Sequence, residues 1–267
     1  MIIFGEKINT INKRVARALK EKDRGFLQGL ALRQAEAGID VLEVNVGMDL
    51  ELEPGMMRWA MEVVQEVMDK PIAIDSPYPE TIRAGLEACR TPQAAVANSI
   101  TLERHRVEGV LPLVKEYGCS LVALPIDERG IPPTAQGRVE LAERLMNLIA
   151  SYGIAPERVY LDCITEPVSV SPDRALVALD TVRAMKGALP EAKTITSITG
   201  ISFGLPRRRV LHWAYLPLLI REGIDALILD PLDRRLMAAL RAAEVLMNED
   251  ENCTRFIEAY RRGALEV

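Results

Sequence analysis

The sequence has no apolar run near the roughly 20 residues that a membrane-spanning helix requires. Its beginning, MIIFGEKINT, passes from a short apolar stretch directly into polar residues, so we expect neither a membrane span nor a signal peptide and predict a cytoplasmic protein. An excess of basic residues is also missing, because 33 basic residues stand against 38 acidic ones, for a net charge of -5. A nucleic-acid partner is therefore not expected, since a phosphate backbone attracts proteins with the opposite balance.

Familiar metal-binding and nucleophilic patterns are absent too. No C-x-x-C spacing occurs among the four cysteines, so we expect free thiols and no zinc or iron–sulfur site. The cysteines are Cys89, Cys119, Cys163 and Cys253. The two histidines are His105, beside Arg106 on a predicted surface helix, and His212, beside Trp213 on another predicted helix. We interpret both as packing or surface residues, and no Ser-His-Asp or Cys-His arrangement can be assembled.

The order of elements is that of a parallel α/β fold. Short β-branched or apolar runs alternate eight times with longer segments in which apolar residues recur three and four positions apart. The predicted strands are Ile2 to Ile8, Val41 to Val46, Pro71 to Asp75, Ala94 to Asn98, Ser120 to Pro125, Val159 to Asp162, Thr194 to Ile198 and Ala226 to Leu229. The predicted helices are Phe26 to Ala37, Met56 to Met68, Glu80 to Cys89, Glu103 to Tyr117, Val139 to Ser151, Pro172 to Met185, Arg209 to Arg221 and Arg234 to Met247.

Helix-ending and helix-starting residues agree with this order. Glycines follow several predicted helices, where a left-handed residue would end the helix and lead into the next strand. They are Gly38, Gly118, Gly153 and Gly223. Ser76-Pro77 and Ser171-Pro172 each resemble a helix N-cap followed by a first-turn proline. The dense basic run Arg207 to Arg209 is either an ordinary solvated helix start or a patch for an acidic partner or a substrate tail.

Eight strand–helix pairs in 267 residues, 49% of them hydrophobic, match the size of one (β/α)₈ TIM barrel. A doubly wound open sheet uses the same alternation, but it usually carries a G-x-G-x-x-G turn after the first strand. Here that turn reads Glu6-Lys7-Ile8-Asn9. We therefore predict a closed barrel that forms a single domain over residues 1–267.

Polar side chains recur at the ends of the predicted strands. They are Glu6, Asn9, Glu43, Asn45, Asp75, Asn98, Asp162 and Asp230. In a barrel of this kind the site lies at the carboxyl ends of the strands, so we expect these groups to line one pocket. Apart from Lys7, no fixed positive charge is expected there.

Carboxylates and carboxamides without arginines suit a flat, neutral heterocycle that offers an amino group and ring N–H donors, such as the aminopyrimidinone of a pterin. A magnesium ion held by oxygen ligands is the alternative, in which the protein would be a metal-dependent barrel lyase or aldolase. Its ligands would be Glu6, Asp75, Asp162 and Asp230.

At these strand ends the sequence resembles the methyltetrahydrofolate:corrinoid methyltransferases. This group belongs to the pterin-binding barrels, which also include the folate-binding domain of cobalamin-dependent methionine synthase and, more distantly, dihydropteroate synthase. The matching strings run in order across nearly the whole chain. They are GEKIN (5–9), EVNVG (43–47), IDSP (74–77), NSI (98–100), LPLVKEYG (111–118), DERGIP (127–132) and ISFGLPRR (201–208).

The resemblance implies a TIM barrel of the dihydropteroate synthase-like type and a specific site. The residues that anchor the pterin ring in the family fall on Asp75, Asn98 and Asp162. We assign further contacts with the pterin or the rest of the substrate to Glu6, Asn9, Asn45 and Arg208. The family reaction moves the N5-methyl group between methyltetrahydrofolate and the cobalt of a corrinoid (cobalamin) carried by a separate protein, and it is reversible. Relatives are commonly homodimers.

One position departs from the family pattern. The family carries an asparagine that contacts N5 of the pterin just before the ISFGLP string, and Gly200 stands there in this sequence. A proton or hydrogen bond at N5 would then come from water, Thr199 or Ser202. We place these three residues at the reacting end of the pterin.

Three functions follow from the sequence. The first is the methyltransferase, and the second is a pterin-binding protein with weak or no transfer activity because of Gly200. Dihydropteroate synthase is disfavoured, because Asp230-Pro231 stands where that enzyme needs a basic anchor for its pyrophosphate leaving group.

Overall fold

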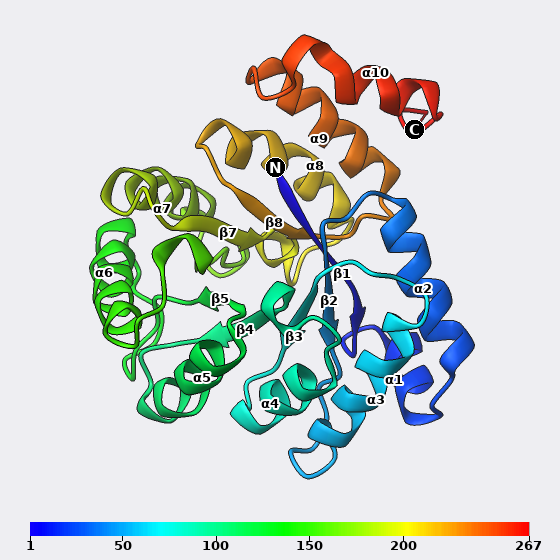
Figure 1. Ribbon diagram of the computed structural model, residues 1–267. Coiled ribbons are helices and arrows are strands. Elements are labelled where there is room, and N and C mark those ends of the chain that lie inside the picture. Colours follow the sequence, from blue (N-terminus) through cyan, green and yellow to red (C-terminus); the bar gives the residue numbers. More distant parts are fainter. Residues whose placement is uncertain (267) are drawn as a thin grey trace.

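The computed structural model describes residues 1–266 as a closed barrel of eight parallel strands (Figure 1). Each strand pairs with the next along the chain, and β8 pairs with β1. The strands are β1 (Ile2–Asn9), β2 (Val41–Asn45), β3 (Ile72–Asp75), β4 (Val96–Ile100), β5 (Ser120–Ala123), β6 (Val159–Asp162), β7 (Lys193–Ser197) and β8 (Ala226–Leu229). The predicted (β/α)₈ barrel is confirmed.

Helices surround the barrel, as Figure 1 shows. They are α1 (Lys13–Lys20), α2 (Arg24–Glu36), α3 (Glu53–Gln65), α4 (Pro79–Ala88), α5 (Arg104–Tyr117), α6 (Ala135–Ser151), α7 (Arg174–Ala188), α8 (Arg209–Arg221), α9 (Arg234–Leu246) and α10 (Thr254–Arg261). Four short 3₁₀ helices are η1 (Pro92–Ala94), η2 (Pro156–Arg158), η3 (Ile198–Ser202) and η4 (Glu251–Cys253). The sequence analysis missed α1 and α10, both of which span eight residues.

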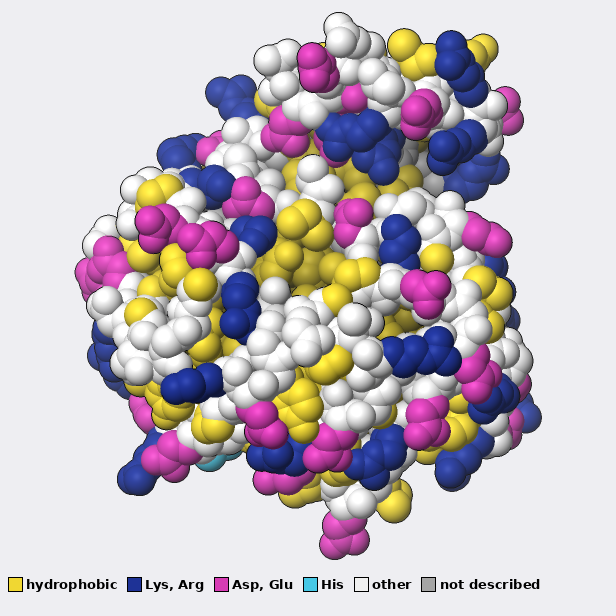
Figure 2. Space-filling model, in the orientation of Figure 1, with side chains coloured by type: hydrophobic (Ala, Val, Ile, Leu, Met, Phe, Trp, Pro, Cys, Tyr) yellow, Lys and Arg dark blue, Asp and Glu magenta, His cyan; other side chains and the backbone are white. Residues whose placement is uncertain are grey.

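Charged side chains of both signs are interspersed over the face drawn in Figure 2. Among residues 1–266, no helix is both long and apolar enough to span a membrane.

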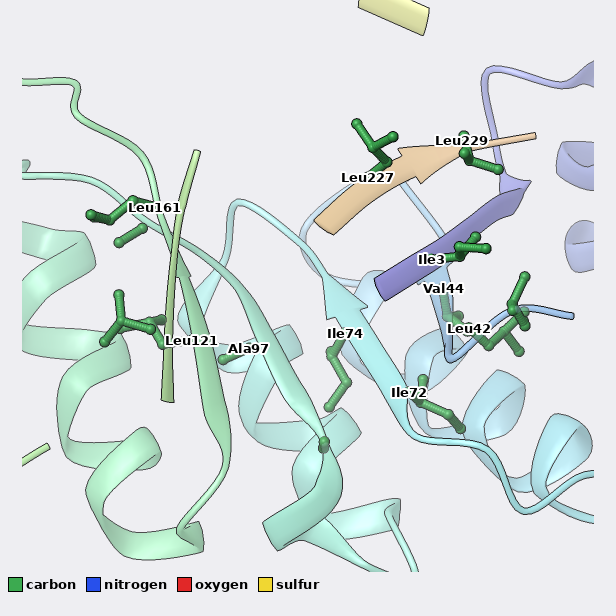
Figure 3. Close-up of a cluster of buried hydrophobic side chains, with 14 of the residues drawn as sticks. Ile3, Leu42, Val44, Ile72, Ile74, Ala97, Leu121, Leu161, Leu227 and Leu229 are labelled. Carbon is green, nitrogen blue, oxygen red and sulfur yellow. The ribbon is translucent and has the colours of Figure 1, made fainter. Parts of the chain in front are cut away.

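Successive side chains of each strand point to opposite faces of the barrel wall, and they build two separate apolar layers. One residue of each pair packs outward against the helices, and Figure 3 shows members of this layer, such as Ile3, Leu42 and Ile74. The other residue faces the barrel interior, where side chains from all eight strands form one cluster. That cluster is Phe4, Val41, Ala73, Val96, Val122, Tyr160, Ile195, Ala226 and Ile228. The next inward position along many of these strands is polar, so the interior changes from apolar to polar toward the carboxyl ends.

The predicted helix-ending glycines are confirmed, whereas the predicted N-caps are wrong. Gly38, Gly118, Gly153 and Gly223 all have positive φ angles, between 68° and 92°. However, α4 starts at Pro79 with Tyr78 as its N-cap, and α7 starts at Arg174 with Asp173 as its N-cap. Ser76 instead accepts a hydrogen bond from the backbone N–H of Tyr78, which forms a turn ahead of the helix.

Candidate functional site

Four neighbouring strands end in a row of polar residues. In the strand register, Asn9 pairs with Asn45, Asn45 with Asp75, and Asp75 with Asn98. The Nδ2 of Asn45 donates to Oδ2 of Asp75 over 2.9 Å. The predicted convergence of Asn45, Asp75 and Asn98 on one rim therefore holds in the structure.

Asp162 reaches the same rim from β6. It lies two positions after the inward-facing Tyr160, as Asp75 lies two positions after Ala73, so the period of two brings both carboxylates to the interior above the apolar layer. Oδ1 of Asp162 accepts the backbone N–H of Ile164 over 2.7 Å, which fixes the orientation of the carboxylate. The structure thus places Asp75, Asn98 and Asp162 around one interior.

Burial raises the pKa of the carboxyl groups in this interior. The pKa of Glu6 rises to about 7, because desolvation outweighs the hydrogen bond from Thr199. The pKa values of Asp75 and Asp162 rise to about 6, again mainly through desolvation. Glu43, between these groups on β2, has a pKa well above its ordinary value because it is buried and near Asp75, Glu6 and Asp162. The sequence analysis expected Glu43 among the groups that line the pocket but assigned it no contact with the substrate.

These pKa values predict an unusual dependence of stability on pH. A carboxyl whose pKa is raised on folding stabilises the folded state at low pH, and this contribution is lost as the pH rises through the folded-state pKa. We therefore expect Glu6, Asp75 and Asp162 to lower the free energy of unfolding between pH 4 and pH 7, by roughly 2 kcal/mol each. Urea unfolding at several pH values would measure this, and Glu43→Gln should reduce the pH dependence. A wild-type protein whose stability rises steadily from pH 4 to pH 7 would contradict the prediction.

A cavity of about 330 Å³ opens beside these carboxyls, over β1, β8, η3 and the start of α8. Its walls combine carboxylates, amides and cations. The lining residues are Glu6, Lys7, Asn9, Ile11, Asn12, Thr199, Phe203, Arg208, Arg209, His212, Asp230 and Asp233. Of the predicted site residues, Glu6, Asn9, Thr199 and Arg208 line this cavity.

Two polar pairs join residues that line the cavity. Oγ1 of Thr199 donates to Oε2 of Glu6 over 3.1 Å, and Ser197 lies 3.1 Å from the same hydroxyl. Nζ of Lys7 forms an ion pair with Asp230 at 2.8 Å. Thr199 and Glu6 thus form a hydrogen-bonded unit that can pass a proton to a group in the cavity.

Arg208 is part of the cavity wall and not a solvated helix start. Its Nε donates to Oγ of Ser202 over 2.9 Å, its Nη2 donates to the carbonyl of Thr199 over 2.8 Å, and its guanidinium stacks on Phe203. Ser202 also lies 2.7 Å from Nε2 of His212. Ser202 is fully buried and is not among the residues that line the cavity, so it supports Arg208 from behind.

Gly200 is held against the backbone of the neighbouring loop. A Cβ atom at this position would lie 2.5 Å from the carbonyl oxygen of Thr165, in the segment that follows β6. In that segment Ile164 has a positive φ of 53°, which is rare for a β-branched residue. Position 200 therefore has no room for a side chain with the loop in this conformation.

Two buried arginines were missed by the sequence analysis, which expected Lys7 to be the only cation near the strand ends. Arg106 was predicted on a surface helix, but it is buried and donates to the carbonyl of Ser99 over 2.9 Å. Arg138 is fully buried, donates to the carbonyls of Cys163 and Ile164, and forms an ion pair with Glu166. Arg138 thereby holds the segment that contacts Gly200.

A signal for these arginines exists in the sequence. Arg106 precedes Val110 and Leu113 by four and seven positions, and Arg138 precedes Leu141 and Leu145 by three and seven. Both arginines therefore lie on the apolar stripes of their helices, near the ends that face the site.

The acidic groups do not form a recognisable metal site. Within the described part of the chain, no group of three or more His, Cys, Asp or Glu side chains is arranged to hold a metal ion. Asp230, one of the four predicted magnesium ligands, is paired with Lys7. This geometry gives the lyase alternative no support.

The family model described as "Pterin binding enzyme" matches residues 8–230, and the chain belongs to this family. The chain is 31% identical to the methylcorrinoid:tetrahydrofolate methyltransferase of Eubacterium limosum, over 99% of this chain and 98% of that protein. The resemblance to the corrinoid-linked folate methyltransferases is confirmed.

Two further comparisons agree with the family. The chain is 29% identical to methionine synthase of Mycobacterium leprae, over 85% of this chain and 20% of that larger protein. A dihydropteroate synthase structure from Yersinia pestis, with a pterine-sulfa conjugate, superposes with a TM-score of 0.70 at 12% identity, covering 92% of this chain and 93% of that one. At that identity, the superposition shows a shared fold only.

Proposed function

We propose that this protein is a methyltransferase that moves the N5-methyl group between methyltetrahydrofolate and the cobalt of a corrinoid held by a partner protein. The observation that carries the proposal is the gathering of Asp75, Asn98 and Asp162 at one rim, beside an open cavity. The full-length similarity to the Eubacterium limosum enzyme supports the same reaction.

The strand-end residues suit the pyrimidine part of a pterin. Ionised Asp75 and Asp162 would accept hydrogen bonds from the amino group and ring N–H, and Asn98 can both donate and accept. Oε2 of the buried Glu43 has no hydrogen-bond partner among residues 1–266, so a further carboxyl oxygen near Asp75 is free to bond to a ligand. The residues present therefore fit a flat ring that donates several hydrogen bonds.

The cavity would hold the reacting end of the substrate. Thr199 and Glu6, which line this cavity, would deliver a proton to N5 and so make the pterin a better leaving group. Arg208 fixes the Thr199 carbonyl and so orients that loop. The corrinoid would supply the cobalt that exchanges the methyl group, and the protein's part is to orient the substrate and stabilise charge at N5.

A spectroscopic titration with methyltetrahydrofolate, followed by addition of Co(I) cobalamin, tests the proposal. We expect saturable binding and then single-turnover formation of methylcobalamin. Binding without transfer would favour a pterin-binding protein that has little or no transferase activity because Gly200 replaces the asparagine of the family. No binding, together with an activity that depends on magnesium or manganese, would favour the barrel lyase.

Glu6→Gln should slow single-turnover transfer about a hundredfold or more, because glutamine keeps a hydrogen bond to Thr199 but cannot donate a proton. In the wild type the rate should fall as the pH rises through about 7, the pKa of Glu6, and the variant should lack this step. Rapid-mixing kinetics at several pH values would measure both. Glu21→Gln, on the exposed end of α1, is the matched control. A variant with an unchanged pH profile would rule out Glu6 as the proton source.

A further inference from the structure

Asp75 and Asp162 each have a buried arginine near them, in the first turn of a helix that follows. Arg106 is the third residue of α5 and Arg138 is the fourth residue of α6, and both are buried. These positions are unfavourable for a cation, because the start of a helix carries partial positive charge and burial removes the guanidinium from water. Burial accordingly lowers the pKa of both arginines, although the charges of neighbouring carboxylates, such as Glu103 near Arg106, oppose this change.

Arg106 holds the main chain directly after two polar residues of the rim. Its Nη2 donates to the carbonyl of Ser99 over 2.9 Å, and its Nη1 donates to the carbonyl of Ser76 over 3.4 Å. Ser99 follows Asn98 and Ser76 follows Asp75. One guanidinium therefore joins the carboxyl ends of β3 and β4 and fixes the spacing of two side chains of the proposed pterin site.

Arg138 holds the main chain after Asp162 in the same way. Its Nη1 donates to the carbonyls of Cys163 and Ile164, over 3.0 Å and 2.6 Å, and its Nη2 pairs with Glu166 farther along this segment. The backbone N–H of Ile164 in turn donates to Oδ1 of Asp162. Arg138 thus fixes the peptide group that orients the carboxylate.

The charge of Arg106 also acts on Asp75. Burial raises the pKa of Asp75 to about 6, and the amide of Asn45 and then the positive charge of Arg106 limit this rise. The carboxyls of Glu53 and Glu43 lie near Asp75 as well, and their negative charges disfavour its ionised form. Arg106 is the cation among these groups, and none of its hydrogen bonds is made to a carboxylate of residues 1–266. Its charge is therefore available to Asp75.

Arg138 has the corresponding effect on Asp162. Burial raises the pKa of Asp162 to about 6, against a backbone N–H, the hydroxyl of Thr196 and the positive charge of Arg138. Glu43 interacts unfavourably with this carboxylate too. Arg174, a second cation in this region, pairs at 3.5 Å with the same glutamate as Arg138.

We propose that Arg106 and Arg138 are positioning residues of the site, which align Asp75 and Asp162 through the main chain and keep both carboxylates ionised for the ligand. The inference rests on the proposed function, in which these carboxylates accept hydrogen bonds from the pterin. Neither arginine is among the residues that line the site cavity, so both act through the groups they hold.

Equilibrium titration of the intact protein with methyltetrahydrofolate, from pH 5 to pH 8.5, tests the proposal. Arg106→Gln removes the charge but keeps a donor, so the pH below which affinity falls should rise from about 6 by about one unit. Arg138→Gln should shift the profile in the same direction through Asp162. In Arg106→Lys this pH should stay near 6, but affinity at pH 8 should drop severalfold, because an ammonium group does not span two carbonyls as a guanidinium does.

Arg158→Gln is the matched control. Arg158 also holds main-chain carbonyls, since its Nη2 donates to Val114 and its Nε donates to Cys119, each over 3.1 Å. However, Arg158 directly precedes β6 and Cys119 directly precedes β5, at the end of the barrel opposite the site. This substitution should lower stability and leave the pH profile of binding unchanged.

The profiles decide between a positioning role and a merely structural one. A profile that neither glutamine variant shifts, or that Arg158→Gln shifts equally, overturns the inference. If Arg106→Gln does not fold, Arg106→Lys carries the test, and wild-type affinity of that variant at pH 8 overturns the alignment of Asp75 by Arg106.

Urea unfolding without ligand separates this inference from the proposed function. A carboxyl with a raised pKa loses its stabilising contribution as the pH rises through the folded-state pKa, so Arg106→Gln should lose the contribution of Asp75 at a higher pH than the wild type. If this shift occurs but the wild type binds no methyltetrahydrofolate, the proposed function fails and the effect of Arg106 on Asp75 stands. If the wild type binds and neither profile shifts, the positioning role alone is wrong.

Discussion

Asparagine at position 75 or 162 should weaken methyltetrahydrofolate binding by about 1 to 3 kcal/mol for each substitution. Each change keeps the size of the side chain but removes the negative charge that a donor on the pterin would meet. It also gives the side chain an NH₂ group, and this hydrogen-bond donor can face an N–H donor of the pterin. The double variant should lose still more, and equilibrium titration of the purified variants would measure the loss.

The pH dependence of binding provides a second measurement of the same effect. Because the pKa values of Asp75 and Asp162 are about 6, wild-type affinity should fall as the pH drops below 6 and the carboxylates become protonated. Each asparagine variant should show a weaker fall. Asp180→Asn, on the exposed face of α7, is the control and should bind normally. Affinity that is unchanged in both site variants would exclude a pterin at this rim.

Gly200→Asn, which restores the residue of the family pattern, should damage the protein and not improve it. The new Cβ would lie 2.5 Å from the Thr165 carbonyl, which forces the backbone of one loop to move. Overpacking of this kind costs about 1 to 3 kcal/mol of stability. Transfer activity should also fall, because Thr199 precedes the displaced residue and donates to Glu6.

Gly200→Ala separates the steric effect from the amide group. We expect alanine to cost nearly as much stability as asparagine, since the first carbon already makes the close contact. Gly187→Ala is the matched control, because a Cβ there meets no atom within 4 Å in helix α7. Urea unfolding and single-turnover transfer would measure both effects. An active, stable Gly200→Asn variant would contradict this prediction and show that the loop after β6 can move at little cost in stability.

Much of the fold and of the polar rim could be predicted because both follow from local patterns. The period of two in the strands places Asp75 and Asp162 inside the barrel, and parallel strands bring their carboxyl ends to one edge. Glycine after a helix is an equally local signal, and Gly118 and Gly153 end their helices as expected. Helix starts were less well predicted, since Ser76-Pro77 and Tyr78-Pro79 offer competing N-terminal turns.

The wall of the site could not be predicted, because it depends on contacts between distant segments. Arg138 bonds to carbonyls 25 and 26 residues away, and Thr165 fixes the space available to Gly200. Composition around Arg106 resembles an exposed helix start, although its position on the apolar stripe indicates burial. The loss of an asparagine at position 200 was visible in the sequence, but its steric reason required the structure.

The four aligned strand-end residues, Asn9, Asn45, Asp75 and Asn98, have a consequence for the thermodynamics of ligand binding. They are fixed by the main-chain hydrogen bonds of four adjacent strands, so their alignment exists before any ligand arrives. A planar ring that binds to such a preorganised surface loses its own translational and rotational entropy, but the protein loses little conformational entropy. Under the proposed function, rearrangement during a catalytic cycle would then fall mainly on the loops above the row, which would admit and release a partner as large as another protein.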